Sequence, residues 1–121
     1  MLVLRHAQST WNADGRWQGW ADPPLSDEGV RQAHVGGSQL LEALSGAWDA
    51  QRFSSDLLRA RRTAEILGQS AGLTSPLQID DRLRERDVGA WSGSTRAEIE
   101  SIWPAELARW DAGELTAPPG G

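Results

Sequence analysis

The sequence predicts a single α/β domain whose sheet is mainly parallel. Short apolar runs alternate with amphipathic helical segments, the order of elements that places helices between parallel strands. The 121 residues are 39% hydrophobic and 24% charged, as is typical of one globular domain. About three strands are visible, whereas an average sheet has about five or six. We therefore expect the fold to be incomplete at its C-terminal end.

The first two predicted elements are a buried strand and a capped helix. Leu2–Leu4 is a continuous apolar run, typical of a buried strand in a parallel sheet. After a polar segment, a helix is predicted over Asp27–Leu44, with Ser26 as its N-cap and Gly46 as its end. The apolar stripe of this helix consists of Val30, Ala33, Leu40, Leu41 and Leu44.

A second strand, a second helix and a third strand follow. The strand is predicted over Gln51–Ser54 and the helix over Asp56–Ser70, with Ser55 as cap and Gly72 as stop. Leu77–Asp80 alternates between apolar and polar residues, which predicts a short strand. The apolar face of the helix is expected to consist of Leu57, Ala60, Ala64, Leu67 and Ala71.

The last third of the chain is predicted to be a loop followed by helix. The loop covers Arg82–Ser94, and Thr95 and Glu98 have the spacing of a capping box that opens a third helix. Pro104 is expected to kink that helix or to start a new one, because proline lacks the backbone N–H. The chain closes with residues 117–121, which have loop composition.

Composition excludes several classes of function. A net charge of -5 argues against general nucleic-acid binding, which needs a positive field. Without cysteine there is no disulfide framework, no thiolate zinc site and no thiol nucleophile. No apolar run approaches the roughly 20 residues that span a bilayer, and the N-terminal segment is too short for a signal peptide. We expect a cytoplasmic protein with no membrane partner.

Two basic positions are suited to chemistry on an anion. Arg5 and His6 directly follow the first predicted strand, the end of the sheet at which α/β folds bind ligands. Arg59 falls in the first turn of its helix, where the dipole disfavours a cation unless an anion binds there. A surface pair explains the first position as well, and a solvated arginine offset by Asp56 explains the second.

Glu85 is a candidate general acid or base in a segment of mixed charge. Flanking arginines favour its charged form, unless burial raises its pKa. The alternative is an ordinary solvated loop.

Four segments in order resemble the histidine phosphatase superfamily, which contains cofactor-dependent phosphoglycerate mutases and small-molecule phosphatases. They are LVLRHAQSTWN at 2–12, SSDLLRARRTA at 54–64, LRERDVGAWSG at 83–93 and PPGG at 118–121. The resemblance implies a three-layer α/β sandwich of the phosphoglycerate mutase type. It also implies a phosphoenzyme mechanism acting on a small phosphorylated metabolite, without a cofactor or a metal.

The resemblance assigns a role to eight residues. His6 is the nucleophile that becomes phosphohistidine, and Glu85 is the proton donor to the leaving alcohol. The phosphate contacts are Arg5, Asn12 and Arg59, and the substrate contacts are Gln18, Gly19 and Arg96.

The sequence departs from the family pattern at two places. Ala7 stands where much of the family has glycine, which implies a backbone angle that a Cβ tolerates. The family's second active-site histidine, in a strand ending His-Gly, has no counterpart here. Only His6 and His34 are present, and we expect His34 to be structural. Residues 1–121 are thus expected to form one histidine phosphatase domain, truncated before that histidine.

Four readings of function remain open at this stage. We favour a small-molecule phosphatase over a mutase, since Arg109 is the only basic residue between Glu98 and Gly121, too few for a bisphosphate clamp. A catalytically dead phosphate-binding protein is the second alternative. A third is a binding module built on Trp11, Trp17 and Trp20, although we expect these rings to pack their loop onto the sheet.

Overall fold

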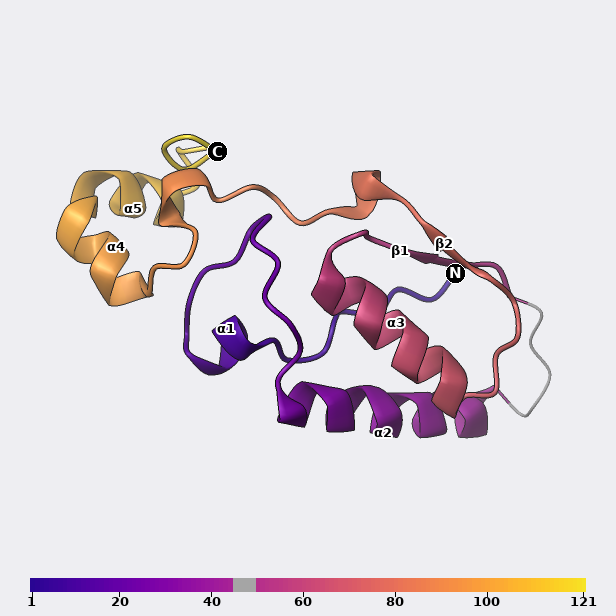
Figure 1. The fold of residues 1–121 in the computed structure, drawn as a ribbon. Helices are drawn as coiled ribbons and strands as arrows, with labels where there is room; N and C mark the ends of the chain where they lie inside the picture. Colours follow the sequence, from indigo (N-terminus) through magenta and orange to yellow (C-terminus); the bar gives the residue numbers. More distant parts are fainter. Residues whose placement is uncertain (45–49) are drawn as a thin grey trace. The chain divides into compact units, whose positions relative to one another are not determined.

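The structure is a computed structural model that describes residues 1–44 and 50–121 (Figure 1). The chain divides into two compact units. Unit 1 comprises Met1–Ser9 and Pro24–Arg84, and unit 2 comprises Thr10–Pro23 and Glu85–Gly121. In the described ranges no helix is long and apolar enough to cross a membrane.

Unit 1 is built on a parallel strand–helix–strand motif. Strand β1 (Arg52–Ser54) pairs in parallel with β2 (Leu77–Ile79), and helix α3 (Leu58–Ser70) connects them and contacts both. The two strands and the connecting helix are as predicted, with slightly shorter bounds. A single-turn 3-10 helix, η1 (Asp81–Leu83), follows β2.

Helix α2 (Asp27–Ala43) packs closely along α3 in unit 1 (Figure 1). Its buried residues are Gly29, Ala33 and Gly37, which recur every four positions. A Cβ at Gly37 would overlap the backbone of Leu67 and the side chain of Ser70, so glycine there allows the close approach. The predicted stripe was therefore only partly right, because small residues carry the contact and Leu41 is exposed.

The helix ends in unit 1 follow local sequence signals with one exception. Ser26 caps α2 as predicted, its hydroxyl accepting from the Gly29 N–H at 3.0 Å. Gly72, at a φ of +68°, follows the end of α3, where the Leu73 N–H donates to the Gly68 carbonyl as in a Schellman motif. The predicted stop at Gly46 lies outside the described residues.

Ser55 does not cap α3, contrary to the prediction. The N-cap is Leu57, which makes no side-chain cap bond, and the Ser55 hydroxyl accepts from the Leu57 N–H at 3.2 Å instead. This local turn satisfies the hydroxyl before the helix begins, so α3 starts two residues later than expected.

The predicted strand at Leu2–Leu4 is also wrong. These residues are assigned no strand, and the sheet of the described residues has the order β1-β2 only. Their side chains are 57%, 78% and 55% exposed. An apolar run forms a strand only when a neighbouring strand pairs with its backbone, and the described part of the chain provides no such ladder at this position.

Unit 2 consists of short helices around an aromatic core. It contains α1 (Thr10–Ala13), the 3-10 turn η2 (Gly89–Trp91), α4 (Arg96–Ile102) and α5 (Pro104–Asp111). The predicted capping box opens α4, and Pro104 is the first residue of α5. The buried core is formed by Val88, Trp91, Ile99 and Leu107, with Trp17, Trp103, Trp110 and Leu115 packed against it.

Candidate functional site

The imidazole of His6 is held through both of its ring nitrogens. Nδ1 lies 2.7 Å from the carbonyl oxygen of Ala7, and a carbonyl only accepts, so Nδ1 carries the proton. Nε2 lies 3.3 Å from Nε of Arg59, which only donates, so Nε2 presents its lone pair. These contacts assign a neutral imidazole whose Nε2 is free of a proton and can act as a nucleophile.

Arg59 is a buried cation of unit 1. Its side chain is 1% exposed, although it is the second residue of α3 and lies at the positive end of the helix dipole. The predicted position in the first turn is confirmed. A guanidinium at such a helix end, beside a nucleophilic nitrogen, is suited to hold the oxyanion of a phosphate group.

The other arginines near Arg59 have different surroundings. Arg5 directly precedes His6 and is exposed. Arg61 and Arg62 are exposed on α3 and each forms an ion pair with Glu65, as expected of surface charges.

Asp56 lies just before α3 and forms a bidentate ion pair with Arg84. This hydrogen bonding by Arg84 lowers the pKa of the Asp56 carboxyl below its ordinary value. Asp56 therefore has a charge partner of its own within unit 1.

In unit 2, the segment that carries Glu85 is anchored to the preceding loop. The indole N–H of Trp20 donates to the Glu85 carbonyl at 2.8 Å. The Arg86 guanidinium lies 4.9 Å from the centre of the Trp110 ring, a cation–π contact. Glu85 is exposed, and the contacts that anchor its segment are made by its own carbonyl and by the following residue, Arg86.

Gln18 and Gly19 lie in the same part of unit 2 as Glu85. Gln18 is buried, and its carbonyl accepts from the Ser92 hydroxyl at 3.3 Å. Gly19 has a φ of +51°, and a Cβ there would overlap Val88, so the close packing of the two segments requires glycine.

Asn12 and Arg96 are also placed in unit 2. Asn12 lies in the four-residue helix α1 and is half-buried. Arg96 opens α4 and makes a bidentate ion pair with Asp111, which raises the pKa of its guanidinium above the ordinary value.

Two alternatives from the sequence can now be compared with the structure. His34 is exposed on α2, and its Nδ1 lies 2.9 Å from the Ser70 hydroxyl of α3, so it is structural as expected. Trp17 packs edge-on against Trp91 and Trp110, at 5.4 and 6.0 Å between ring centres. Its packing role is confirmed, although its partners are indole rings rather than the sheet.

One residue that contacts this site was missed by the sequence analysis. Thr63 is buried in α3, accepts from the Ala7 N–H at 3.0 Å and donates to the Arg59 carbonyl at 2.6 Å. The only signal was its spacing, one helical turn after Arg59, which places both side chains on one face.

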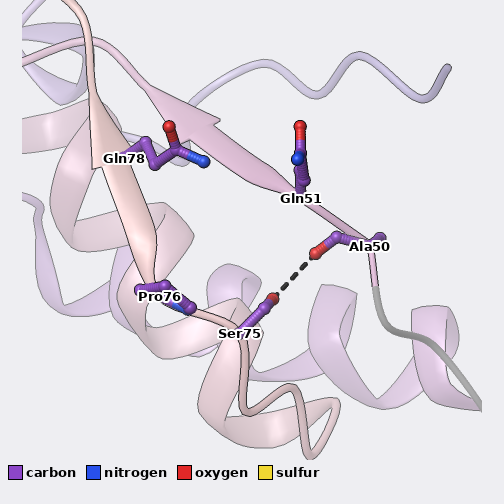
Figure 2. Close-up of a pocket in the computed structure, with 5 residues that line it drawn as sticks. All are labelled: Ala50, Gln51, Ser75, Pro76 and Gln78. Atoms are coloured by element: carbon purple, nitrogen blue, oxygen red, sulfur yellow. Dashed lines mark hydrogen bonds between the residues drawn. The ribbon is translucent and has the colours of Figure 1, made fainter.

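One cavity of unit 1 lies apart from His6 and Arg59. This cavity of about 340 Å³ lies at the beginning of the two strands, where the Ser75 hydroxyl donates to the Ala50 carbonyl (Figure 2). Its lining residues carry no charge: Ala50, Gln51, Ser75, Pro76 and Gln78. Within residues 1–44 and 50–121, no three His, Asp or Glu side chains are grouped to hold a metal ion.

The comparisons with known proteins decide the family. The model of the histidine phosphatase superfamily (branch 1) matches residues 1–121. The chain belongs to this superfamily.

Several relatives within the histidine phosphatase superfamily carry two kinds of name. The chain is 37% identical to a 2,3-bisphosphoglycerate-dependent phosphoglycerate mutase of Afipia carboxidovorans, over 100% of the chain and 58% of that protein. It is 39% identical to a glucosyl-3-phosphoglycerate phosphatase of Mycolicibacterium vanbaalenii, over 100% of the chain and 51% of that protein. The chain thus spans little more than half the length of these relatives.

A solved structure confirms the expected fold class. A mycobacterial glucosyl-3-phosphoglycerate phosphatase in complex with VO3 has a TM-score of 0.83 and 37% identity. The similarity covers 98% of this chain and 54% of that one. The α/β fold of the phosphoglycerate mutase type, with a parallel sheet, is therefore shown.

Proposed function

We propose that the protein carrying this chain is a phosphomonoester hydrolase that forms a phosphohistidine on His6. The observation that carries this proposal is the state of the His6 ring, with its proton on Nδ1 and its Nε2 lone pair beside the buried Arg59. A neutral imidazole next to a fixed guanidinium is what transfer of a phosphoryl group to nitrogen requires.

In the first step, Nε2 of His6 attacks phosphorus and the bond to the leaving oxygen breaks. Arg59 and Arg5 stabilise the charge on the phosphoryl oxygens, and Asn12 is a further contact to them. Glu85 donates a proton to the leaving oxygen, so that a neutral alcohol departs.

In the second step, water hydrolyses the phosphoenzyme. Glu85, now a carboxylate, accepts a proton from the water as its oxygen bonds to phosphorus. The bond between Nε2 and phosphorus breaks, which releases phosphate and regenerates the neutral imidazole. The proton balance closes, since Glu85 loses one proton in the first step and regains one in the second.

The substrate in this proposal is a small phosphorylated metabolite, with Gln18, Gly19 and Arg96 as substrate contacts. Relatives named as a phosphoglycerate mutase and as a glucosyl-3-phosphoglycerate phosphatase support a phosphorylated three-carbon acid or its derivative. We further propose that residues 1–121 are the part of one domain that precedes the second active-site histidine. The chain covers 58% and 51% of these two relatives, which supports this proposal.

Mutase activity is the second candidate, supported by the mutase names among the relatives. The scarcity of basic residues from Glu98 to Gly121 favours the phosphatase. A mutase needs priming by a bisphosphoglycerate, so isomerisation of phosphoglycerate without net release of phosphate would replace the phosphatase assignment by this one.

Transfer of label from a phosphomonoester to the protein tests the proposal directly. The chain has only two histidines, which provides a matched pair of variants. In the protein as its gene encodes it, wild type and His34→Ala should acquire an acid-labile, alkali-stable phosphate, and His6→Ala should not. Hydrolysis should be lost only in His6→Ala, because His34 is bound to Ser70 on the surface. Equal labelling of His6→Ala would remove His6 as the nucleophile.

A further inference from the structure

We infer that Thr63 is a positioning residue that fixes the reactive tautomer and orientation of the His6 imidazole, through the Ala7 peptide and the Arg59 carbonyl. The inference rests on the proposed function for its kinetic consequence. The geometry on which it depends lies entirely within unit 1.

The Thr63 hydroxyl uses its donor and one of its acceptor sites on two backbone groups. It donates to the Arg59 carbonyl one turn earlier in α3 at 2.6 Å, and it accepts from the Ala7 N–H at 3.0 Å. Because a hydroxyl has one proton, donation to Arg59 leaves only lone pairs toward Ala7. The direction of both bonds is therefore fixed.

Four residues form a closed circuit of contacts. Thr63 binds the N–H of Ala7, and the carbonyl of Ala7 accepts from Nδ1 of His6. The circuit closes because Nε2 of His6 accepts from Nε of Arg59, whose own carbonyl accepts from Thr63. A displacement of the Ala7 backbone, whose N–H and carbonyl belong to consecutive peptide groups joined at Cα, thus moves the acceptor that keeps the proton on Nδ1.

The other side of the same loop is held by α2, while the Thr63 hydroxyl bonds to its backbone from α3. The Ser26 N–H donates to the Gln8 carbonyl at 3.0 Å, and the Gln8 N–H donates to the Gln32 side chain at 3.0 Å. Gly29 lies so close to Gln8 that a Cβ would overlap its carbonyl oxygen. The segment after His6 thus lies between α2 and α3, and the hydroxyl of Thr63 holds its backbone on the side of α3.

Removal of the hydroxyl leaves a buried donor without its acceptor. Ala7 and Thr63 are 9% and 7% exposed, so water does not readily replace the lost bond. The Ala7 N–H is then expected to turn toward another acceptor, and the accompanying shift of the Ala7 Cα moves the Ala7 carbonyl, which belongs to the next peptide group, away from Nδ1. A misplacement of about 1 Å at a reacting group reduces the rate by up to about 100-fold.

The test compares three variants of Thr63 in the protein as its gene encodes it. Thr63→Val keeps the shape and replaces the hydroxyl by a methyl group. Thr63→Ala removes both the hydroxyl and the methyl group of threonine, and Thr63→Ser keeps the hydroxyl and removes only the methyl group. Thr74, an exposed threonine of unit 1, provides the control Thr74→Val. The readouts are hydrolysis of p-nitrophenyl phosphate, the ¹⁵N chemical shifts of the His6 ring and the thermal midpoint.

The expected result separates chemistry from binding. Thr63→Val and Thr63→Ala should lower kcat by about 10- to 100-fold with KM nearly unchanged. Their His6 nitrogens should show a mixture of tautomers, whereas wild type, Thr63→Ser and Thr74→Val keep the proton on Nδ1. Wild-type shifts and wild-type kcat in both Val and Ala variants would overturn the inference. A parallel fall of kcat and thermal midpoint in all three variants, Thr63→Ser included, would show a merely structural role and also overturn it.

The two proposals fail in different ways. If wild type forms no phosphohistidine, the proposed function fails, while the ¹⁵N shifts still report whether Thr63 sets the His6 tautomer. If wild type is labelled and Thr63→Val is labelled at the same rate with unchanged shifts, only the inference about Thr63 fails.

Discussion

The two units use their apolar residues in opposite ways. In unit 2, Trp91 and Ile99 are completely buried in a core of large side chains. In unit 1 the buried cluster consists of Ala7, Ala33 and Ile66, with Leu25 and Val30 packed against it. Many large apolar residues of unit 1 are exposed instead, among them Leu2, Val3, Leu4, Phe53, Ile79 and Leu83.

The two units also hold their candidate site residues in different ways. In unit 2 the segment of Glu85 is anchored to the aromatic core through Arg86, which lies over the Trp110 ring. The exposed Trp20 indole, outside that core, donates to the Glu85 carbonyl. Unit 1 positions His6 and Arg59 by hydrogen bonds and close backbone contacts rather than by large buried side chains. Such a site tolerates little change in geometry, because hydrogen bonds are directional and closely packed backbones leave no room for displacement.

The largest expected effect is on the stability of unit 2. Trp91→Ala should reduce the free energy of unfolding by about 3–5 kcal/mol, since it empties the centre of the core. All tryptophans except Trp48 lie in unit 2, so denaturation followed by tryptophan fluorescence reports mainly on this unit. Trp20→Ala is the matched control, because that ring is 50% exposed and its loss should cost much less. Equal losses would mean that the aromatic core is not what stabilises unit 2.

The next effect concerns the polar site of unit 1. Arg59→Ala should weaken transition-state stabilisation by about 3 kcal/mol, on the order of a 100-fold loss in kcat/KM. Arg61→Ala is the control on the same helix, because Arg61 is exposed and paired with Glu65, and its kinetics should stay at wild-type values. A loss below about tenfold for Arg59→Ala would make its burial a structural feature rather than a phosphate contact.

The sequence predicted some elements of the two units correctly and others wrongly. The capping box at Thr95, the start of α5 at Pro104 and the helix at Asp27–Ala43 were predictable, because each depends on chemistry within a few residues of chain. The strand expected at Leu2–Leu4 was not confirmed, since strand formation depends on a partner that periodicity does not report.

The buried face of α3 shows the same limit within a helix. The predicted apolar face was partly right, because Leu57 and Ala71 at the two ends of α3 are buried. Within α3 the structure also buries Arg59, Thr63 and Ile66, which the predicted face did not contain. A buried arginine and a buried threonine are polar exceptions that only tertiary contacts to His6 and Ala7 explain. The resemblance to the family pointed to Arg59 from the sequence, whereas the role of Thr63 follows only from its contacts with Ala7 and Arg59 in the folded chain.

A pair of glycine variants in α2 sharpens the claim that unit 1 depends on close backbone contacts. Gly29→Ala should destabilise the protein by about 1–3 kcal/mol, because its Cβ would overlap the Gln8 carbonyl. Gly36→Ala should stabilise it by about 0.5–1 kcal/mol, since the nearest atom to its Cβ is Leu67 Cδ1 at an ordinary 3.7 Å. The measurement is urea denaturation of both variants. Stabilisation by Gly29→Ala would refute the tight contact beside His6.

The smallest expected effect is a pH dependence of the stability of unit 1, caused by the ion pair between Asp80 and Arg82. Hydrogen bonding by Arg82 lowers the pKa of Asp80 from 3.8 to about 2. A carboxyl with a lowered pKa in the folded state stabilises that state above its ordinary pKa, and this contribution is lost as the pH falls from about 4 through about 2. Asp80→Asn and Arg82→Gln should therefore both flatten the acid limb of stability against pH, measured by urea denaturation.

The effect should be modest because the Arg82 side chain is 85% exposed, and solvent and salt screen such a pair. That modest size is itself informative about unit 1. If either variant instead removed a large part of the stability at neutral pH, the exposed pair would contribute more than the small buried cluster of Ala7, Ala33 and Ile66. Unit 1 would then differ from unit 2 because an ion pair, rather than close packing of small residues, stabilises it.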